Sequence, residues 1–253
     1  GIGFFGSLRR NQVYAIYSSA NKMFFRTKLL LGGTALARLQ ASSVIIFGLG
    51  GVGSFAAEAL LRAGIHKLTL VDSDVVDVTN LNRQLEASTL TIGRQKTEAM
   101  KERLAAINPE AELNTINTFL LPGNEQEFFG GKSYDYAVDA IDTITAKIAL
   151  AKYCHDEGIP LVSSMGAANK LDPTKFRVAD IFETSVDPIA KVMRKKLKEL
   201  GVPKLKVVYS TETPLSITKN EDGEKILGSV SFVPSVAGMI LASVVVRDII
   251  GRK

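Results

Sequence analysis

Four glycines that follow a short apolar segment could hold a phosphate. The segment covers residues 44–47, and Gly48, Gly50, Gly51 and Gly53 come soon after it. Three of them match the G-x-G-x-x-G motif, in which a buried strand ends in a turn too tight for side chains and a helix begins. The free N–H groups and the positive dipole end of such a helix face a bound phosphate. The glycines alone do not distinguish NAD, FAD and ATP.

An acid and two cations further along the chain bear on which nucleotide binds. Asp72 ends the second apolar segment, where an acid often binds a ribose hydroxyl in both NAD- and ATP-binding proteins. A polar loop then carries Asn80 and Arg83, and Lys96 stands in the first turn of the next predicted helix. Adenylyl transfer builds negative charge on the α-phosphoryl group and the leaving pyrophosphate, which cations stabilise. The loop therefore favours ATP over a dinucleotide, whose pyrophosphate the helix N-terminus largely satisfies.

Asp142 is a candidate Mg²⁺ ligand. It ends the fourth predicted strand, so it is expected at the same edge of the sheet as the glycines. Proteins usually hold Mg²⁺ through one or two carboxylates, and phosphates and water complete the coordination. The same side chain could also cap the helix that follows. Asp139, by contrast, is expected within the strand.

The elements that position these residues alternate between strand and helix. Strands are expected at residues 44–47, 67–74, 111–120, 134–142 and 159–166, and later ones at 177–182, 205–212 and 229–235. Helices are expected at 34–40, 52–63, 94–107, 143–158 and 236–250, and a basic helix and the polar turn "TKNEDGEK" separate the later strands. We therefore predict an α/β fold: a Rossmann-like, mostly parallel sheet with helices on both faces and late antiparallel strands.

Composition and charge limit the classes of function. The 253 residues carry a formal net charge of +5, which mildly favours a polyanionic partner. Cys154 is the only cysteine, so one chain can form neither a disulfide nor a Cys-rich zinc site, and a cytoplasmic location is expected. No run of about 18 apolar residues is present, so no transmembrane segment is expected.

Several segments together resemble a known superfamily. They are "GLGGVGS", "LVDSDVVDVTNLNRQ", "GRQKTEAMKERLAAINP" and "VDAIDT". In combination they resemble the ubiquitin-activating enzyme superfamily, which includes the adenylating enzymes of thiamine and molybdopterin synthesis, ThiF and MoeB. The resemblance implies that Asp72 binds the ribose of ATP, that Asn80, Arg83 and Lys96 contact its phosphates, and that Asp142 organises Mg²⁺.

The resemblance runs from about residue 25 to residue 253 and implies an assembly. The segment "FRTKLLLGG" resembles the N-terminal helix of the superfamily, whose arginine reaches the ATP of the partner subunit. That arginine would be Arg26, acting across a homodimer interface. We expect one adenylating domain at residues 23–253, with a nucleotide-binding half at about 23–165 and a substrate-facing half at about 166–253. Residues 1–22 are expected to be a flexible extension, a targeting segment or non-native sequence.

Members of the superfamily differ in what captures the acyl-adenylate. This chain has no C-x-x-C pair, and Cys154 is predicted within a helix, so a protein thioester lacks a nucleophile. The second half, with "SSMGAANKLDP" and "YSTETP", resembles the tRNA threonylcarbamoyladenosine dehydratase branch. The resemblance implies that the carboxylate of the modified adenosine is adenylated and that ring closure releases AMP. Some relatives have a cysteine where this chain has Val207 and Val208, which weakens any role for a thiol.

A cluster of cations in the second half fits an RNA substrate. The cations expected to contact tRNA phosphates are Lys191, Arg194, Lys195, Lys196 and Lys198, and Lys204 and Lys206 follow them. A merely solubilising helix face would have the same composition. Three alternatives stay open: an activator of a sulfur-carrier or ubiquitin-like protein, a non-catalytic binding module, and an NAD-dependent oxidoreductase. A sulfur-relay protein partner is also possible.

Overall fold

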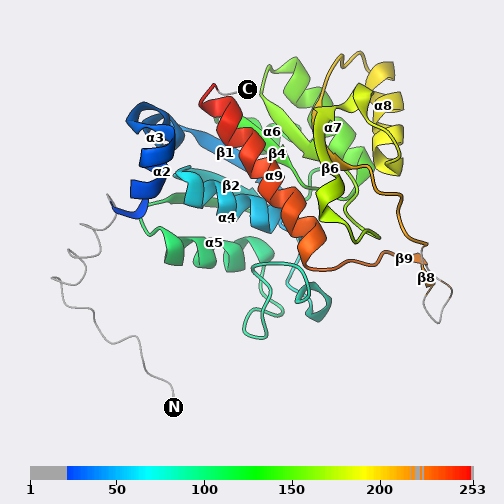
Figure 1. Cartoon of the computed structure of the whole chain (residues 1–253), viewed down its shortest axis with the longest axis horizontal. Helices are drawn as coiled ribbons and strands as arrows, with labels where there is room; N and C mark the ends of the chain where they lie inside the picture. The colour runs from blue at the N-terminus through cyan, green and yellow to red at the C-terminus, as the bar shows by residue number, and fades with distance from the viewer. Residues whose placement is uncertain (1–21, 217, 220–222, 224, 252–253) are drawn as a thin grey trace.

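A single sheet forms the centre of the structure. The computed structural model describes residues 22–216, 218–219, 223 and 225–251, so all of the predicted extension except Lys22 lies outside the described residues. Within them, seven strands form one sheet in the order β3-β2-β1-β4-β5-β7-β6 (Figure 1). The strands are β1 Ser43–Phe47, β2 Lys67–Val71, β3 Glu112–Ile116, β4 Tyr136–Asp139, β5 Leu161–Ser164, β6 Phe176–Asp180 and β7 Lys206–Ser210. All neighbours are parallel except β6 and β7, which confirms the predicted fold class.

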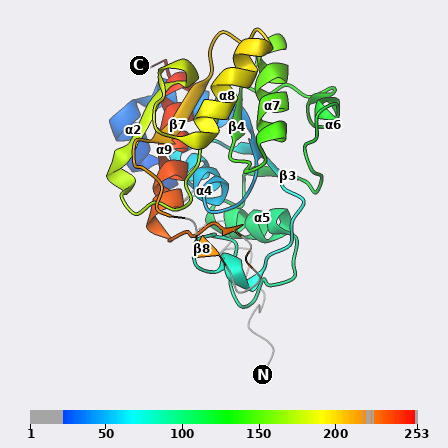
Figure 2. The ribbon, with the colours of Figure 1, turned by 90° about the vertical axis from the view of Figure 1, so that its right-hand side faces the viewer.

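Helices cover both faces of this sheet, as predicted (Figure 2). They are α2 Phe25–Leu31, α3 Gly33–Ala41, α4 Gly53–Ala63, α5 Lys96–Ile107, α6 Glu125–Phe129, α7 Ile144–Asp156, α8 Pro188–Glu199 and α9 Phe232–Ile249. On β1, Val44 and Ile46 pack into a core with α3, α4, α5 and α9, whereas Ile45 and Phe47 pack into a core with α6 and α7. This alternation is the two-residue period of a strand that is buried on both faces.

The carboxyl ends of β1, β2 and β4 meet at one edge of the sheet. Phe47, the last residue of β1, is in register with Val71, the last of β2, and with Asp139, the last of β4. The glycine loop, the polar loop that starts at Asp72 and the segment 140–143 therefore leave the sheet side by side. Ligands bind at this edge in open parallel sheets.

The strand predicted at residues 229–235 is wrong, because α9 begins at Phe232. Pro234 lies in the first turn of α9, where the N–H groups have no intrahelical acceptor, so a proline costs no hydrogen bond. Val233 and Pro234 are both buried. The alternation of serine and apolar residues is typical of a strand. The burial of the Val233 and Pro234 side chains nevertheless favours the helix.

α9 lies along α4 (Figure 1). A Cβ atom at Gly238 would lie 2.2 Å from the Val52 carbonyl oxygen, so only glycine allows this close approach of the two helices. Among the described helices, α9 alone is long and apolar enough to cross a membrane, and 44% of it is buried. Its packing against α4 makes it a core helix of this fold.

Some short elements are absent from the sequence prediction, among them α6 and the strand pair β8–β9. α6 is too short to show a helical period, and its Phe128 and Phe129 rings pack against Phe47 with centroids 5.4 and 5.7 Å away. The predicted turn "TKNEDGEK" begins and ends in an antiparallel strand pair, β8 Thr218–Lys219 and β9 Lys225–Ile226. Part of the turn between β8 and β9 lies outside the described residues.

Candidate active site

The glycine loop is a tight turn between β1 and α4. Gly48 has φ +86°, and a Cβ atom there would lie 2.7 Å from the Ala140 carbonyl oxygen. A Cβ atom at Gly53 would lie 1.8 Å from the Gly48 carbonyl oxygen. Both positions therefore require glycine, whereas Gly50 has ordinary space around it. The turn presents the N-terminus of α4, which suits a phosphate.

Asp72 leaves the end of β2 and contacts the glycine loop directly. Its Oδ2 accepts a hydrogen bond from the Leu49 amide at 2.7 Å, and its Oδ1 accepts one from the Asp74 amide at 2.9 Å. Burial raises the pKa of Asp72, although both N–H donors and the nearby Lys96 ammonium oppose this rise. The structure thus brings together the predicted ribose acid and the predicted phosphate loop.

Lys96 is the first residue of α5, at the point where the polar loop comes back to the edge of the sheet. Its side chain is 8% exposed, and its Nζ pairs with Asp74 Oδ2 at 2.8 Å. Its backbone N–H donates to the Asp74 carbonyl oxygen at 3.0 Å. An isolated bridge between Val75 and Gln95 closes the base of the loop. The ammonium of Lys96 is therefore held by Asp74 near Asp72, and its contact with a phosphate remains a prediction.

Arg83 and Asn80 share a turn within the polar loop. Arg83 Nη1 donates to the Thr79 carbonyl oxygen and to Asn82 Oδ1, both at 2.9 Å. The Arg83 side chain also lies beside the glycine loop, because a Cβ atom at Gly51 would lie 3.1 Å from its Cγ. The side chain of Asn80 is buried. Phosphate contacts from Arg83 and Asn80 remain predictions.

Asn80 has a clear structural task that the sequence did not predict. Its Oδ1 accepts from the Asp77 amide at 3.0 Å and completes a capping box on the short helix η1 Val78–Asn80. Its carbonyl oxygen accepts from the Arg83 and Gln84 amides at 3.1 and 3.0 Å. Asn80 thereby shapes the turn that carries Arg83.

Asp142 is exposed beyond the end of β4. The N-cap of α7 is Thr143, with no side-chain cap hydrogen bond, so the capping role considered for Asp142 is wrong. The described residues hold no group of three or more metal-binding side chains. An exposed single carboxylate beside a phosphate site fits Mg²⁺, which takes most of its ligands from phosphates and water.

A buried ion pair that the sequence analysis missed fixes the loop before Asp142. Asp139 ends β4, as expected, and its Oδ2 lies 2.9 Å from Lys147 Nζ, with both side chains fully buried. Asp139 Oδ1 accepts from the Ile141 amide, and Lys147 Nζ donates to the Ile141 carbonyl oxygen, both at 3.0 Å. The sequence signal was a lysine among the apolar positions of the predicted helix at 143–158, because a buried charge requires a partner.

A cavity of about 500 Å³ lies between the segment 169–171 and the segments before and after the β8–β9 pair. Its lining residues are Asn169, Lys170, Leu171, Leu215, Ser216, Lys219, Ile226, Gly228, Ser229 and Val230. Asn82, next to Arg83, donates to the Ser229 carbonyl oxygen at 3.1 Å, and Pro234 Cγ would lie 3.1 Å from a Cβ atom at Gly51. The Asn82–Ser229 hydrogen bond thus links one wall of the cavity to the polar loop that carries Arg83.

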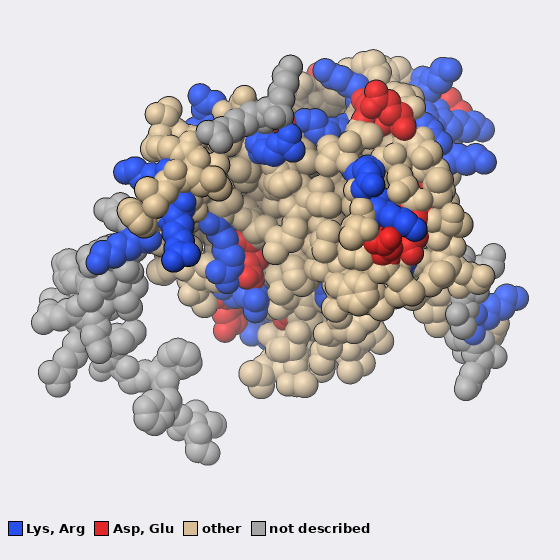
Figure 3. Space-filling view, viewed as in Figure 1, with Lys and Arg blue, Asp and Glu red and all other residues tan. Residues whose placement is uncertain are grey.

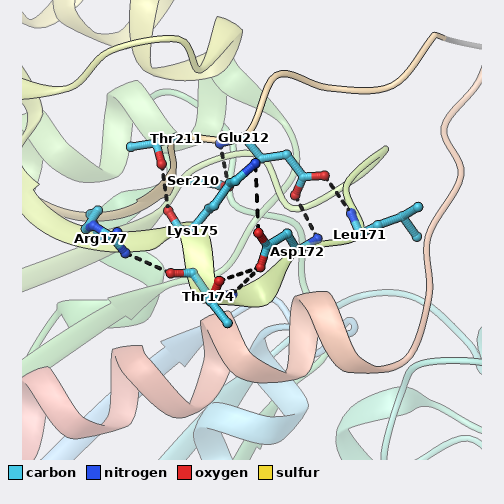
Figure 4. Close-up of polar contacts among 8 residues, drawn as sticks. All are labelled: Leu171, Asp172, Thr174, Lys175, Arg177, Ser210, Thr211 and Glu212. Atoms are coloured by element: carbon cyan, nitrogen blue, oxygen red, sulfur yellow. Dashed lines mark hydrogen bonds and ion pairs between the residues drawn. The ribbon is translucent and has the colours of Figure 1, made fainter.

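Two polar residues hold the walls of this cavity. Glu212 is largely buried and accepts from the Leu171 and Asp172 amides, one on each carboxylate oxygen, both at 2.9 Å (Figure 4). Asn169 has φ +57° and joins three segments: its N–H donates to Gly228, its carbonyl oxygen accepts from Leu215, and its Oδ1 accepts from the Gly228 amide. The cavity is therefore built from segments distant in sequence.

Comparison with known proteins decides the family. The sequence model of the ThiF family matches residues 25–252. The chain belongs to the ThiF family. A Bacillus subtilis relative named tRNA threonylcarbamoyladenosine dehydratase is 47% identical over 242 residues, which cover 90% of this chain and 94% of the relative. An Escherichia coli relative of the same name is 41% identical over 197 residues, covering 75% of this chain and 73% of the relative.

Solved structures agree with this assignment. The crystal structure of the E. coli tRNA N6-threonylcarbamoyladenosine dehydratase in complex with ATP matches with a TM-score of 0.83 and 35% sequence identity, and the match covers 91% of this ThiF-family chain and 95% of that chain. The same protein in complex with AMP matches with a TM-score of 0.84 and the same identity and coverage.

The basic helix of this ThiF-family chain is α8. Lys191, Lys195 and Lys198 are exposed and share one face of the helix, because residues three and four apart are neighbours on a helix surface. None of the three forms an ion pair with another described residue. Figure 3 shows Lys and Arg side chains gathered over α8. This face is the candidate RNA surface.

Three other cations of the predicted RNA set have partners within the chain, whereas Lys204 is exposed and forms no ion pair with a described residue. Arg194 Nη1 donates to the Thr184 carbonyl oxygen at 2.9 Å, and Lys196 pairs with Glu199 at 2.9 Å. Lys206 lies on β7 and pairs with Asp248 of α9 at 2.6 Å. These contacts hold the positions of the three side chains, whereas RNA contact by them remains a prediction.

Cys154 is an unsuitable nucleophile in this ThiF-family chain. It lies on α7 and is 1% exposed, as expected for a core residue. Burial, followed by the nearby Asp139 charge, raises the pKa of its thiol to about 12. At neutral pH the sulfur is therefore a buried thiol, not a reactive thiolate.

Arg26 lies far from the glycine loop of its own chain. It is exposed on α2, which packs against α3, and Arg38 at the end of α3 donates to the Ile249 carbonyl oxygen at 3.3 Å. Ile249 ends α9, whereas Pro234 at the start of α9 lies beside the glycine loop. A helix of this length spans roughly 27 Å. The structure does not bring Arg26 to the nucleotide site of the same subunit.

Proposed function

We propose that this chain catalyses the ATP-dependent dehydration of threonylcarbamoyladenosine in tRNA, at the nucleotide beside the anticodon. The observation that carries the proposal is the 47% identity to the B. subtilis dehydratase over nearly the whole of both chains. The E. coli structures named as complexes with ATP and with AMP support a nucleotide at the glycine loop. The product would be a cyclic form of the modified nucleoside, together with AMP and pyrophosphate.

The first step transfers AMP to the substrate. The carboxylate of the threonylcarbamoyl group attacks the α-phosphorus of ATP, and pyrophosphate leaves. The Asp72 carboxylate accepts hydrogen bonds from the ribose hydroxyls, and the N–H groups at the N-terminus of α4 donate to a phosphate. Arg83 and Lys96 stabilise the negative charge that builds on the phosphoryl group. For this role, the Lys96 ammonium must partly give up its ion pair with Asp74. Asp142 would hold Mg²⁺, which neutralises phosphate charge when bound.

The second step needs no nucleophile from the protein. A group of the same modification attacks the activated acyl carbon, the ring closes, and AMP leaves with the oxygen lost from the substrate. The net change is the loss of one water. Attack within one molecule is favoured by proximity, and the buried thiol of Cys154 is consistent with this route. A sulfur-relay partner is therefore not required.

The modified base would occupy the cavity of about 500 Å³. Leu171, Leu215 and Ile226 line it and are each about half exposed, which gives apolar walls for the faces of a base. The Asn82–Ser229 hydrogen bond joins this cavity to the loop of Arg83. A carboxylate on a base held there would approach the phosphates of ATP.

The RNA backbone would lie on α8, and the active unit would be a homodimer. Lys191, Lys195 and Lys198 offer three phosphate contacts without a competing ion pair among the described residues. On α2, Phe25, Leu29 and Leu30 are 57%, 71% and 75% exposed. Exposed apolar side chains on one short helix favour burial against a second copy, which would bring Arg26 to the nucleotide of the partner. The site of action would be the cytoplasm.

One assay tests the proposal. The protein is incubated with ATP, Mg²⁺ and tRNA carrying threonylcarbamoyladenosine, and the tRNA is digested to nucleosides. We expect the modified nucleoside to lose the mass of one water while AMP forms in equal amount. The relatives include molybdopterin-synthase adenylyltransferases, one of which is 34% identical over 53% of this chain. Formation of AMP only with a small protein that ends in Gly-Gly would therefore overturn the proposal.

A further inference from the structure

Glu86 is a buried acid for which the proposed reaction has no use. It lies in the polar loop between η1 and α5 and is 3% exposed. Neither of its carboxylate oxygens forms a hydrogen bond with a described residue, although its own amide and the Ser54 hydroxyl lie near enough to lower its pKa. Leaving a buried polar group without a partner costs free energy, so such groups are rare and mark strain or function.

Five of the nine unpartnered buried side-chain atoms of the described residues lie in the polar loop, between Ser73 and Gln95. Besides both oxygens of Glu86, they include Ser73 Oγ, Gln84 Oε1 and Gln95 Oε1. Ser73 follows the ribose acid, and Gln95 precedes Lys96. The Ser54 hydroxyl of α4 also faces Glu86, but it donates its hydrogen to the Gly50 carbonyl oxygen at 2.7 Å. Because its hydrogen is bound by Gly50, the Ser54 hydroxyl cannot donate it to the Glu86 carboxylate.

One cation, Lys96, lies among four acids at this place: Glu86, Asp72, Asp74 and Asp77. Lys96 from α5 attracts Glu86, and Asp72 from the end of β2 repels it. Asp74 already holds the Lys96 ammonium at 2.8 Å. Burial is the largest influence on Glu86 and raises its pKa to about 8. The Glu86 carboxyl is therefore mostly neutral at pH 7 and ionises just above it.

We propose that Glu86 is a positioning residue that couples a proton to ATP binding through Lys96. With the proton bound, Glu86 does not compete for the Lys96 ammonium, which can turn from Asp74 to a phosphate. When the proton is released to solvent, the Glu86 carboxylate attracts the ammonium and adds a negative charge beside the anionic nucleotide. ATP binding at a pH where Glu86 is ionised must then take up one proton. The inference rests on the proposed function only in assigning Lys96 to the phosphates.

The test measures ATP binding without tRNA. Isothermal titration with ATP and a constant Mg²⁺ concentration is carried out at pH 7.5 and pH 9, on the wild type and on Glu86→Gln, which keeps the volume and remains neutral. We expect the wild-type affinity to fall about five- to tenfold over this interval, because each ionised Glu86 must regain its proton. The affinity of Glu86→Gln should change less than twofold. Equal falls in both proteins would overturn the inference.

A second measurement does not depend on the variant. At pH 8.5, titration of the wild type in two buffers with different ionisation enthalpies counts the protons taken up with ATP. We expect more than half a proton per site, and an uptake near zero would overturn the inference. Glu58→Gln is the matched control, because Glu58 pairs with Arg62 and Arg103 on the surface side of α4, and it should keep the wild-type pH dependence.

The two proposals fail separately. If ATP binding shows this proton linkage but tRNA is not dehydrated, the proposed function is wrong and the role of Glu86 stands. If tRNA is dehydrated and ATP binding is independent of pH between 7.5 and 9, the role of Glu86 is wrong and the proposed function stands.

Discussion

Lys147 and Asp139 form an ion pair at 2.9 Å in which both side chains are completely buried. The pair joins α7 to the end of β4 and holds the Ile141 peptide from both sides. The segment that leads to Asp142 is therefore shaped by charges that never meet solvent. Removal of either partner leaves the other charge buried without compensation.

Lys147→Met should lower the free energy of unfolding by about 3–5 kcal/mol, because Asp139 would keep a buried charge without its cation. Urea unfolding followed by circular dichroism measures the loss. The double variant Asp139→Asn with Lys147→Met should recover most of it, because no unpaired charge remains. A single variant as stable as the wild type would show that the pair is not buried in solution.

Arg83→Ala and Lys96→Ala should each lower kcat/KM at least 100-fold, since each removes a cation placed at the phosphates, a loss of about 2.7 kcal/mol in transition-state stabilisation. AMP formation with threonylcarbamoyladenosine-containing tRNA measures the effect, and circular dichroism confirms folding. Arg94→Ala is the control, because Arg94 lies near the end of the same loop but its guanidinium pairs with the exposed Glu102 of α5. Near-wild-type rates from Arg83→Ala or Lys96→Ala would refute the site.

Leu215→Ser should raise KM for modified tRNA at least fivefold while the affinity for ATP stays constant, because the side chain lines the proposed base pocket and not the glycine loop. Steady-state kinetics at saturating ATP and a separate ATP titration distinguish the two effects. Leu121→Ser offers a matched control, since Leu121 is similarly exposed, at 58%, and does not line the cavity. An unchanged KM for tRNA would place the base elsewhere.

Simultaneous replacement of Lys191, Lys195 and Lys198 by alanine should weaken tRNA binding and reduce its dependence on salt. Each phosphate contact contributes roughly 0.7–0.9 to the slope of log K against log salt, so the loss of three contacts should reduce the slope by about 2. Filter binding at several salt concentrations gives the slope. Replacement of the exposed Lys67 and Lys132 should leave it intact, and an equal reduction in this control would mean that only net charge matters.

Glu86 should also make stability depend on pH. Its pKa in the folded chain is about 8, above the usual 4.5, so the folded state keeps a proton that the unfolded state releases between these values. The free energy of unfolding therefore falls as the pH rises from about 4.5 to 8. At pH 7, Glu86→Gln should be more stable than the wild type by up to about 3 kcal/mol. Urea unfolding at pH 5, 6, 7 and 8 tests this, and parallel curves for the two proteins would contradict it.

The sequence determined the alternating strands and helices of the parallel part of the sheet and the kinds of residue at its edge. The glycine spacing, Asp72 after the second strand and Lys96 at the start of a helix are local signals, because each depends on a few neighbouring residues and on the register of parallel strands. The family could also be inferred, since the segment around Asn80 and Arg83 is specific in its residue types. These inferences needed no knowledge of which side chains meet.

The tertiary structure alone decided how charges and surfaces are paired. Lys147 looked like an ordinary helix residue until Asp139 was found opposite it, and Glu86 looked like a loop acid until its burial was known. Residues 229–235 had the alternation of a strand, but packing against α4 made their C-terminal part the first turn of α9. Burial and partnership depend on residues far apart in the chain, so no local pattern encodes them. For that reason, the chemistry of the site could be inferred from the sequence, whereas the groups that hold and tune it could not.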